Sequence, residues 1–231
     1  MLARLQTAIA LSLLVLAAAW LVFTLPDGRW LAAALGLLLL AGGDALVLGL
    51  ECLLVARVNR HDPAPAASVV QWLRAWSGEC LSAPRVFLWQ QPFRSRRWPD
   101  QLPAHAQGRR GLLLVHGFVC NRGIWNRWLQ RLTAQGVPFV AVDLEPVFGS
   151  IDDYRTCIDD AVARLWACTG VAPLVVAHSM GGLALRRWRA GPGQAARIAH
   201  VITLGTPHHG TWLARWAFVP NAVQMRLHGI G

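Results

Sequence analysis

The sequence contains no lysine, and all 22 of its basic residues are arginine. The use of arginine in place of lysine, in a chain so rich in alanine, is typical of a biased codon composition. It does not by itself indicate a binding surface. Acidic residues are also few, 12 in all, so the formal net charge is +10 at pH 7. No nucleic-acid-binding motif accompanies that charge. We therefore expect the arginines to face an anionic membrane surface and not nucleic acid.

Metal-binding and disulfide patterns are missing as well. The cysteines form no C-x-x-C pair and no zinc-ligand spacing, and their odd number, five, argues against a disulfide framework. We expect free thiols in a reducing compartment, packed as small core residues, and we expect neither a metal nor a cofactor. The five are Cys52, Cys80, Cys120, Cys157 and Cys168.

Apolar sequence, in contrast, is abundant, and 55% of the residues are hydrophobic. Leu5–Leu25 contains no charged residue and is long enough to span a bilayer. After a short polar turn, Trp30–Leu54 forms a second apolar stretch, interrupted only by Asp44 and Glu51. The sequence therefore predicts a transmembrane hairpin that serves as an anchor over residues 1–60. An alternative interpretation makes the first stretch a signal peptide with its cleavage site at Ala17–Ala19.

Arginines near the two stretches indicate an orientation. Arg4 precedes the first stretch, and Arg57 and Arg60 follow the second, whereas the turn between them carries one arginine and one acid. The positive-inside rule then places both ends of the hairpin in the cytoplasm. We expect two spans in the inner membrane of a bacterium with a cytoplasmic globular domain; the alternative is a domain on the periplasmic face.

The rest of the chain divides into a connecting region, residues 61–84, and a globular domain, residues 85–231. His61–Ala67 contains two prolines and is typical of a stiff linker. From Ser68 to Cys80, apolar residues recur at helical spacing, which predicts an amphipathic helix. That helix either lies on the membrane surface or covers the globular domain and packs on its core.

Short apolar runs alternate with helix-like segments through the globular domain. Such alternation is typical of an α/β fold with a doubly wound, mostly parallel sheet. In that architecture, the polar groups at the carboxyl ends of the strands converge on one crevice. The predicted strands are Arg85–Trp89, Gly111–Val115, Phe139–Val142, Leu174–Ala177 and His200–Leu204.

The fourth of these runs leads into a serine. Leu174–Ala177 is followed by His178 and Ser179, and a helix is predicted from Met180 to about residue 190. A strand, a sharp turn with a serine and a helix together form a nucleophile elbow. The strained turn needs small residues two positions before and after the serine, and Ala177 and Gly181 meet that need.

Three motifs in this order resemble the α/β-hydrolase lipases and esterases: His116–Phe118, Ala177–Gly182 and Gly205–Thr211. The sequence is most similar to bacterial triacylglycerol lipases and to the hydrolase domain of GPI inositol-deacylases. The resemblance covers about residues 85–215 and implies an α/β-hydrolase fold preceded by two transmembrane helices.

The resemblance also implies roles for individual residues. Ser179 would be the nucleophile, and the main-chain N–H groups of Phe118 and Met180 would form the oxyanion hole. Trp212, Trp216 and Phe218 would begin a lid or an acyl-binding wall, or else belong to a helix that covers the sheet. The residues that support the motifs are His116, Gly117, Ala177, His178, Gly181, Gly182, Thr206, Pro207 and His208.

A catalytic acid and base are not identified. A serine hydroxyl needs a histidine that is oriented by a carboxylate, and in this fold they follow the serine in the order acid, then histidine. No Asp or Glu follows Asp160, and the only histidines after Ser179 are His200, His208, His209 and His228. We expect a C-terminally truncated hydrolase whose later strands are missing and whose strand at residues 200–204 forms an unpaired edge.

The sequence therefore favours a membrane-anchored serine hydrolase that cleaves carboxylic esters, including those of lipids, through an acyl-enzyme on Ser179. Two alternatives stay open: an inactive, truncated remnant or binding protein, and an acyltransferase of the same fold. The expected partners are an ester or lipid substrate and the membrane. The sequence leaves the oligomeric state open.

Overall fold

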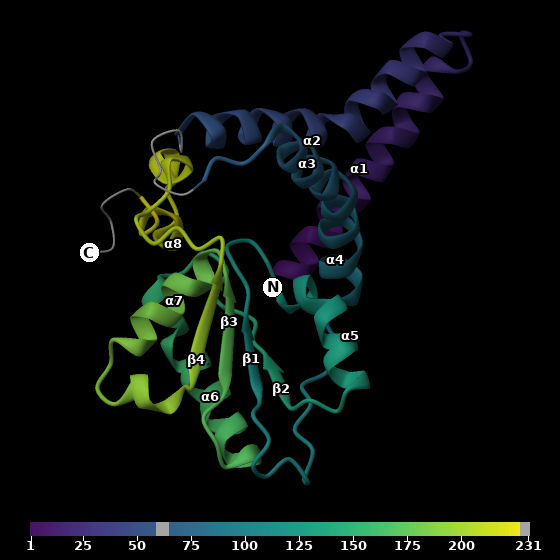
Figure 1. The fold of residues 1–231 in the computed structure, drawn as a ribbon. Coiled ribbons are helices and arrows are strands. Elements are labelled where there is room, and N and C mark those ends of the chain that lie inside the picture. Colours follow the sequence, from purple (N-terminus) through teal and green to yellow (C-terminus); the bar gives the residue numbers. More distant parts are fainter. Residues whose placement is uncertain (59–64, 227–231) are drawn as a thin grey trace. The chain divides into compact units, whose positions relative to one another are not determined.

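The fold is that of a computed structural model, which describes residues 1–58 and 65–226 (Figure 1). It divides into two units. One is Gln6–Trp89, and the other is Gln90–Gly231 together with Met1–Leu5. Residues 61–64 of the expected linker lie outside the described residues.

Two long helices form the first part of the chain, α1 (Leu2–Thr24) and α2 (Trp30–Val58). Both are long and apolar enough to cross a membrane by length and composition. Only 11% of the most apolar window of α1 and 6% of that of α2 are buried, unlike a core helix of a soluble domain. The Trp20 indole N–H donates to the Ala32 carbonyl at 3.1 Å, and a Cβ at Gly36 would overlap that indole. A small residue thus lets the indole approach α2 closely.

Helix α3 (Val69–Arg85) packs against α2. Ser68 and Gln71 form a capping box at its start, which satisfies two N–H groups of the first turn. The indole N–H of Trp76, in the middle of α3, donates to the carbonyl of Ala45 in α2 at 2.8 Å. Within its unit, α3 is thus held against α2, and the two positions expected for this amphipathic helix stay predictions.

The strand predicted at Arg85–Trp89 is wrong. Helix α3 extends to Arg85 and continues into a π-helical turn, η2 (Val86–Gln90), and then α4 (Gln91–Arg94). A run of four apolar residues does not distinguish a strand from a helix by its periodicity. Here the preceding helix simply continues through it.

Four parallel strands form the sheet of the second unit, in the order β2–β1–β3–β4. The central strand β1 pairs with both β2 and β3, so that Leu113 lies opposite Val140 on one side and Val175 on the other. This arrangement confirms the expected α/β fold with a parallel sheet. The strands are β1 (Leu112–Val115), β2 (Phe139–Ala141), β3 (Leu174–His178) and β4 (His200–Leu204).

Helices cover both faces of this sheet (Figure 1). Helix α5 (Asn126–Ala134) packs on one face, where its Leu129 contacts side chains of β1, β2 and β3. Helices α6 (Arg155–Thr169) and α7 (Met180–Arg189) cover the other face and form the larger core. The shorter helical turns are η3 (Arg122–Trp125), η4 (Ile151–Tyr154), η5 (Gln194–Arg197), η6 (Trp212–Trp216) and α8 (Pro220–Val223).

Strand β4 is an edge of the described sheet, because it pairs with β3 alone. Its Ile202 and Leu204 are 47% and 36% exposed, although the three middle residues of the neighbouring strand β3 are buried. The sequence-based expectation of an open edge at residues 200–204 is therefore confirmed within the described residues.

Candidate functional site

Ser179 lies at the sharp turn between β3 and α7, in a strained backbone conformation. Its φ and ψ angles are 52° and −127°. Among the described residues other than glycine, only Val119 and Ser179 have a positive φ. A side chain rarely adopts this conformation, which costs roughly 1–3 kcal/mol and persists only where the surroundings enforce it. The half-buried serine is thus held at the carboxyl end of the sheet, where the sequence placed the elbow.

Glycines make room for this turn on three sides. A Cβ at Gly117 would lie 2.8 Å from the Cβ of Ser179, so the loop after β1 passes directly beside the serine. A Cβ at Gly181 would overlap the His116 carbonyl and lie 2.9 Å from that of Val115. Gly182 faces Thr206, whose Cγ2 would be 2.7 Å from an added Cβ. These contacts give a physical reason for the glycine at each of the three motif positions.

The two N–H groups expected to form the oxyanion hole belong to residues that flank the elbow. Met180 begins α7, directly after the serine, and Phe118 follows Gly117 in the neighbouring loop. Within residues 1–58 and 65–226, neither N–H donates a hydrogen bond to another group of the chain. Within the described part of the chain, neither donor is therefore committed to another group, as an oxyanion hole would require.

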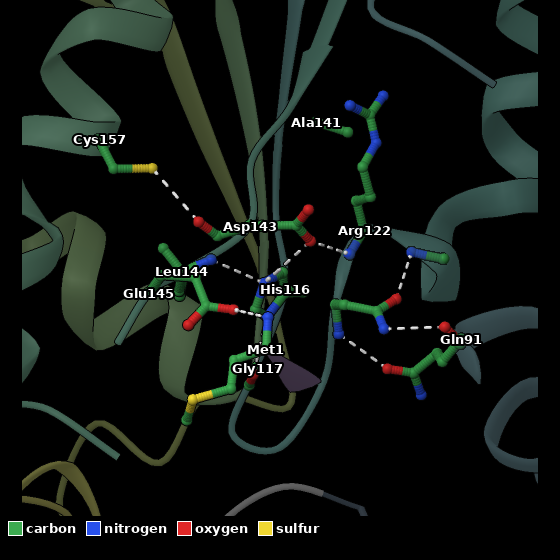
Figure 2. A network of polar contacts seen from close by, with 12 residues as sticks. Met1, Gln91, His116, Gly117, Arg122, Ala141, Asp143, Leu144, Glu145 and Cys157 are labelled. Atoms are coloured by element: carbon green, nitrogen blue, oxygen red, sulfur yellow. Dashed lines mark hydrogen bonds and ion pairs between the residues drawn. The ribbon is translucent and has the colours of Figure 1, made fainter. Parts of the chain in front are cut away.

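His116 fixes the loop that carries Phe118, and Figure 2 shows it at the centre of a network of polar contacts. Its Nε2 accepts the N–H of Leu144 at 2.9 Å, and its Nδ1 lies 2.9 Å from the Gly117 carbonyl. With Nε2 as an acceptor, the ring is neutral and Nδ1–H donates to Gly117. Burial lowers the pKa of His116 and outweighs the bond to Gly117 and the nearby Asp143 and Glu145. Both ring nitrogens are thus engaged in holding the loop.

Two residues outside the predicted site, Asp143 and Gln91, complete this network. The carboxylate of Asp143 accepts the N–H of Arg122 at 2.8 Å and lies 3.9 Å from Nε2 of His116. The side-chain oxygen of Gln91 accepts the N–H of Asn121 at 2.8 Å, and the Asn121 amide donates to the Gln91 carbonyl at 3.0 Å. These contacts join α4 to the loop after β1. No local pattern in the sequence predicts the partner of Gln91, which lies 30 residues away.

The other predicted residues lie around the elbow in different ways. Ala177 is fully buried in the core of β3. The Nδ1 of His178 borders Gly117, 3.1 Å from the position of an added Cβ. His208 is exposed and turns toward β4, with its Nε2 3.3 Å from the Thr203 hydroxyl. The Pro207 carbonyl accepts the N–H of Gly210, which closes the turn that contains His208.

Trp212 and Trp216 lie together in the short turn η6, with ring centroids 4.7 Å apart in an edge-to-face contact. They are 48% and 57% exposed, and Phe218, just after the turn, is 92% exposed. Ala214 anchors the turn in the core. The three aromatic side chains are thus exposed on and directly after a short 3₁₀ turn, and their roles stay predictions.

A second pair of unpredicted polar residues fixes α8. The buried amide of Asn221 donates to the Val147 carbonyl at 2.8 Å and to the Tyr154 hydroxyl at 2.9 Å. Gln224 accepts the N–H of Ile151 at 2.7 Å. The segment that follows the aromatic turn is therefore bound to η4 by side-chain hydrogen bonds, for which the sequence offered no periodic signal.

No histidine or carboxylate in the described part of the chain hydrogen-bonds to the Ser179 hydroxyl. His228, one of the histidines considered from the sequence, lies outside the described residues. Those same residues contain no group of three or more His, Cys, Asp or Glu side chains that could hold a metal ion.

Comparison with known proteins relates this arrangement to one family. The sequence model described as "Alpha/beta hydrolase family" matches residues 112–229. Among solved structures, the mature Bacillus licheniformis lipase BlEst2 is similar, with 20% identity, a TM-score of 0.49, and coverage of 56% of this chain and 60% of that one. Its propeptide form gives 20% identity, a TM-score of 0.48 and coverage of 57% and 32%.

Aspergillus fumigatus lipase B is also similar, with 20% identity, a TM-score of 0.45, and coverage of 58% of this chain and 36% of that chain. The chain thus spans less than two thirds of each of these lipase chains. No curated protein matches it.

Proposed function

The chain belongs to the alpha/beta hydrolase family, and we propose that it is a lipase- or esterase-like hydrolase with Ser179 as its nucleophile. One observation carries the proposal: the chain holds Ser179 at a positive φ between β3 and α7, beside two N–H donors without a partner among the described residues. A serine at such a turn and N–H donors beside it supply two of the parts that acyl transfer through a tetrahedral oxyanion requires, the nucleophile and the oxyanion hole. The third part is a base that accepts the serine proton, and the described residues place none beside the hydroxyl.

The proposed reaction has two steps. In the first, Oγ of Ser179 bonds to the ester carbonyl carbon and the carbon–oxygen bond to the alcohol breaks. The serine proton leaves with the alcohol, and the Phe118 and Met180 N–H groups stabilise the oxyanion. In the second step, water attacks the acyl-enzyme, which releases the acid and restores the hydroxyl. Neither step needs a metal or an electron carrier.

Covalent labelling with a fluorophosphonate tests the proposal on the full chain in detergent micelles. We expect the wild-type protein to be labelled at Ser179 and the Ser179→Ala variant to remain unlabelled. Thr203→Val is the matched control, because it removes a hydroxyl from a residue outside the elbow. It should be labelled as strongly as the wild type. If the folded wild type shows no labelling that depends on Ser179, the hydrolase proposal is wrong and a binding role with the same architecture is favoured.

We further propose that α1 and α2 anchor the hydrolase in a bilayer, with lipid esters as the substrates within reach. Support comes from the length and exposure of the two helices and from the arginines at both ends of the hairpin. The chain should stay with the membrane in alkaline carbonate, and its release would contradict the anchor. In sealed inner-membrane vesicles with the cytoplasmic side outward, protease should digest the globular domain; protection would place it on the opposite face.

A further inference from the structure

The main chain of Ser179 is held by the last residue of β4 and by the segment that follows it. Its N–H donates to the Leu204 carbonyl at 2.8 Å, and its own carbonyl accepts the Thr206 hydroxyl at 2.9 Å. The same carbonyl accepts the N–H of Gly182 at 3.0 Å, within the first turn of α7. Thr206 therefore provides the single side-chain contact in this set, and it comes from a residue 27 positions away.

The carbonyl of Ser179 and the N–H of Met180 belong to one peptide unit, which is planar and trans. Rotation of that unit swings both groups together. A hydrogen bond that fixes the carbonyl consequently fixes the direction of the Met180 N–H at the opposite side of the plane. A carbonyl that accepts hydrogen bonds also polarises its peptide unit, which strengthens the N–H as a donor.

We propose that Thr206 is a positioning residue that orients the Met180 N–H toward the oxyanion through the Ser179 carbonyl. The effect on catalysis rests on the proposed function. The orientation of the Met180 N–H is a property of the folded chain and can be tested without it.

The fit between Thr206 and Gly182 supports this role. A Cβ at Gly182 would overlap the Thr206 hydroxyl and lie 2.9 Å from its Cβ. The half-buried threonine therefore occupies the space that a side chain at position 182 would need. A larger residue at Gly182 would push the hydroxyl away from the carbonyl, so the two positions depend on each other.

Two substitutions at Thr206 separate the hydroxyl from the shape of the side chain. Thr206→Val keeps the shape and removes the donor, whereas Thr206→Ser keeps the donor and removes a methyl group. Loss of a direct oxyanion donor lowers kcat by about 100-fold or more, so loss of a group that only orients the donor should cost about tenfold. We expect that decrease in kcat for a short-chain p-nitrophenyl ester with Thr206→Val, with KM unchanged and near wild-type kcat for Thr206→Ser.

Amide hydrogen exchange tests the orientation without any turnover. In the full chain in micelles, Thr206→Val should speed exchange at the Ser179 and Gly182 amides by about tenfold, and Thr206→Ser should not. Thr203→Val, on β4, should leave these amides unchanged. Equal exchange rates in Thr206→Val and the wild type would overturn the inference. If the wild type hydrolyses the ester, an equal kcat in Thr206→Val would also overturn it.

The two experiments fail in different ways. If the wild type neither labels at Ser179 nor hydrolyses ester, the proposed function is wrong, and the exchange rates alone decide whether Thr206 holds the peptide unit. If the wild type is active and Thr206→Ser is as slow as Thr206→Val, the side chain acts through packing and the hydroxyl does not position the donor.

Discussion

Removal of the Ser179 side chain is expected to stabilise the protein. The φ of 52° and ψ of −127° at this position are costly for a residue with a Cβ and accessible to glycine. Relief of the strain should gain roughly 1–3 kcal/mol. Greater freedom of glycine in the unfolded chain costs about 0.5–1 kcal/mol. The Ser179 hydroxyl makes no hydrogen bond within the described residues, so none is lost, and the net gain from Ser179→Gly is about 1 kcal/mol.

The assay is thermal unfolding of the full chain in micelles, followed by near-ultraviolet circular dichroism. Ser179→Ala is the matched control, because it removes the hydroxyl and keeps the strained Cβ. A change of about 1 kcal/mol shifts Tm by roughly 2–4 °C in a protein of this size. We expect Ser179→Gly to unfold 2–4 °C above Ser179→Ala, and Ser179→Ala to unfold close to the wild type.

A double substitution sharpens the test. A Cβ at Gly117 would meet the Ser179 Cβ at 2.8 Å, so Gly117→Ala should destabilise the wild type. The same substitution in the Ser179→Gly background should cost less, because one of the two clashing atoms is gone. If Ser179→Gly and Ser179→Ala unfold at the same temperature, and the Gly117→Ala cost is equal in both backgrounds, the strain argument is refuted.

Three other outcomes follow from the structure. Gly181→Ala should lower stability by about 3 kcal/mol in the same unfolding assay, because its Cβ meets main-chain carbonyls, whereas Gly78→Ala in α3, with nothing nearby, should not. The pKa of His116 is lower in the folded protein than its ordinary value of 6.5, so the neutral ring stabilises the fold. This stabilisation is complete above pH 6.5 and is lost as the pH falls toward the folded-state pKa. The Tm of the wild type should therefore fall more between pH 7.5 and 5.5 than the Tm of His116→Gln. Burial raises the pKa of the Cys157 thiol to about 11, so its alkylation rate, followed by mass spectrometry, should still rise about tenfold per pH unit from pH 7 to 9; a plateau near pH 8.5 would contradict this.

The sequence was sufficient for the parts of the fold that rest on local patterns. The unbroken apolar runs at β1 and β3 predicted buried parallel strands, and the structure confirms them. Ser150 and Asp153 form a capping box at the start of η4, and a serine followed three residues later by an acid is a local pattern typical of a helix start. Gly170 ends α6 in the left-handed conformation that a helix-terminating glycine favours.

What sequence reasoning missed depends on contacts between distant residues. The segment Arg85–Trp89 looks like a strand until α3 is known to continue through it. Asn221 contacts Tyr154, 67 residues away, and Gln91 contacts Asn121 across 30 residues. Isolated amides of this kind carry no periodic signal, since their partners are fixed only once the sheet and its loops have formed.

The motif around Ser179 is explained more fully by backbone geometry than by chemistry. Gly117, Gly181 and Gly182 are each glycine because a Cβ would meet the serine, a main-chain carbonyl or Thr206. Thr206 in turn holds the Ser179 carbonyl. These four positions lie in the loop after β1, in the first turn of α7 and in the loop after β4. All of them follow from the need to hold one strained residue and its peptide unit. A sequence that keeps these residues therefore indicates a preserved turn geometry at Ser179, whereas the proposed catalysis depends separately on the Ser179 hydroxyl. Labelling at that hydroxyl and hydrogen exchange at the elbow amides measure these two properties independently, so we expect Thr206→Val to alter both and Ser179→Ala to abolish labelling with the amide exchange intact.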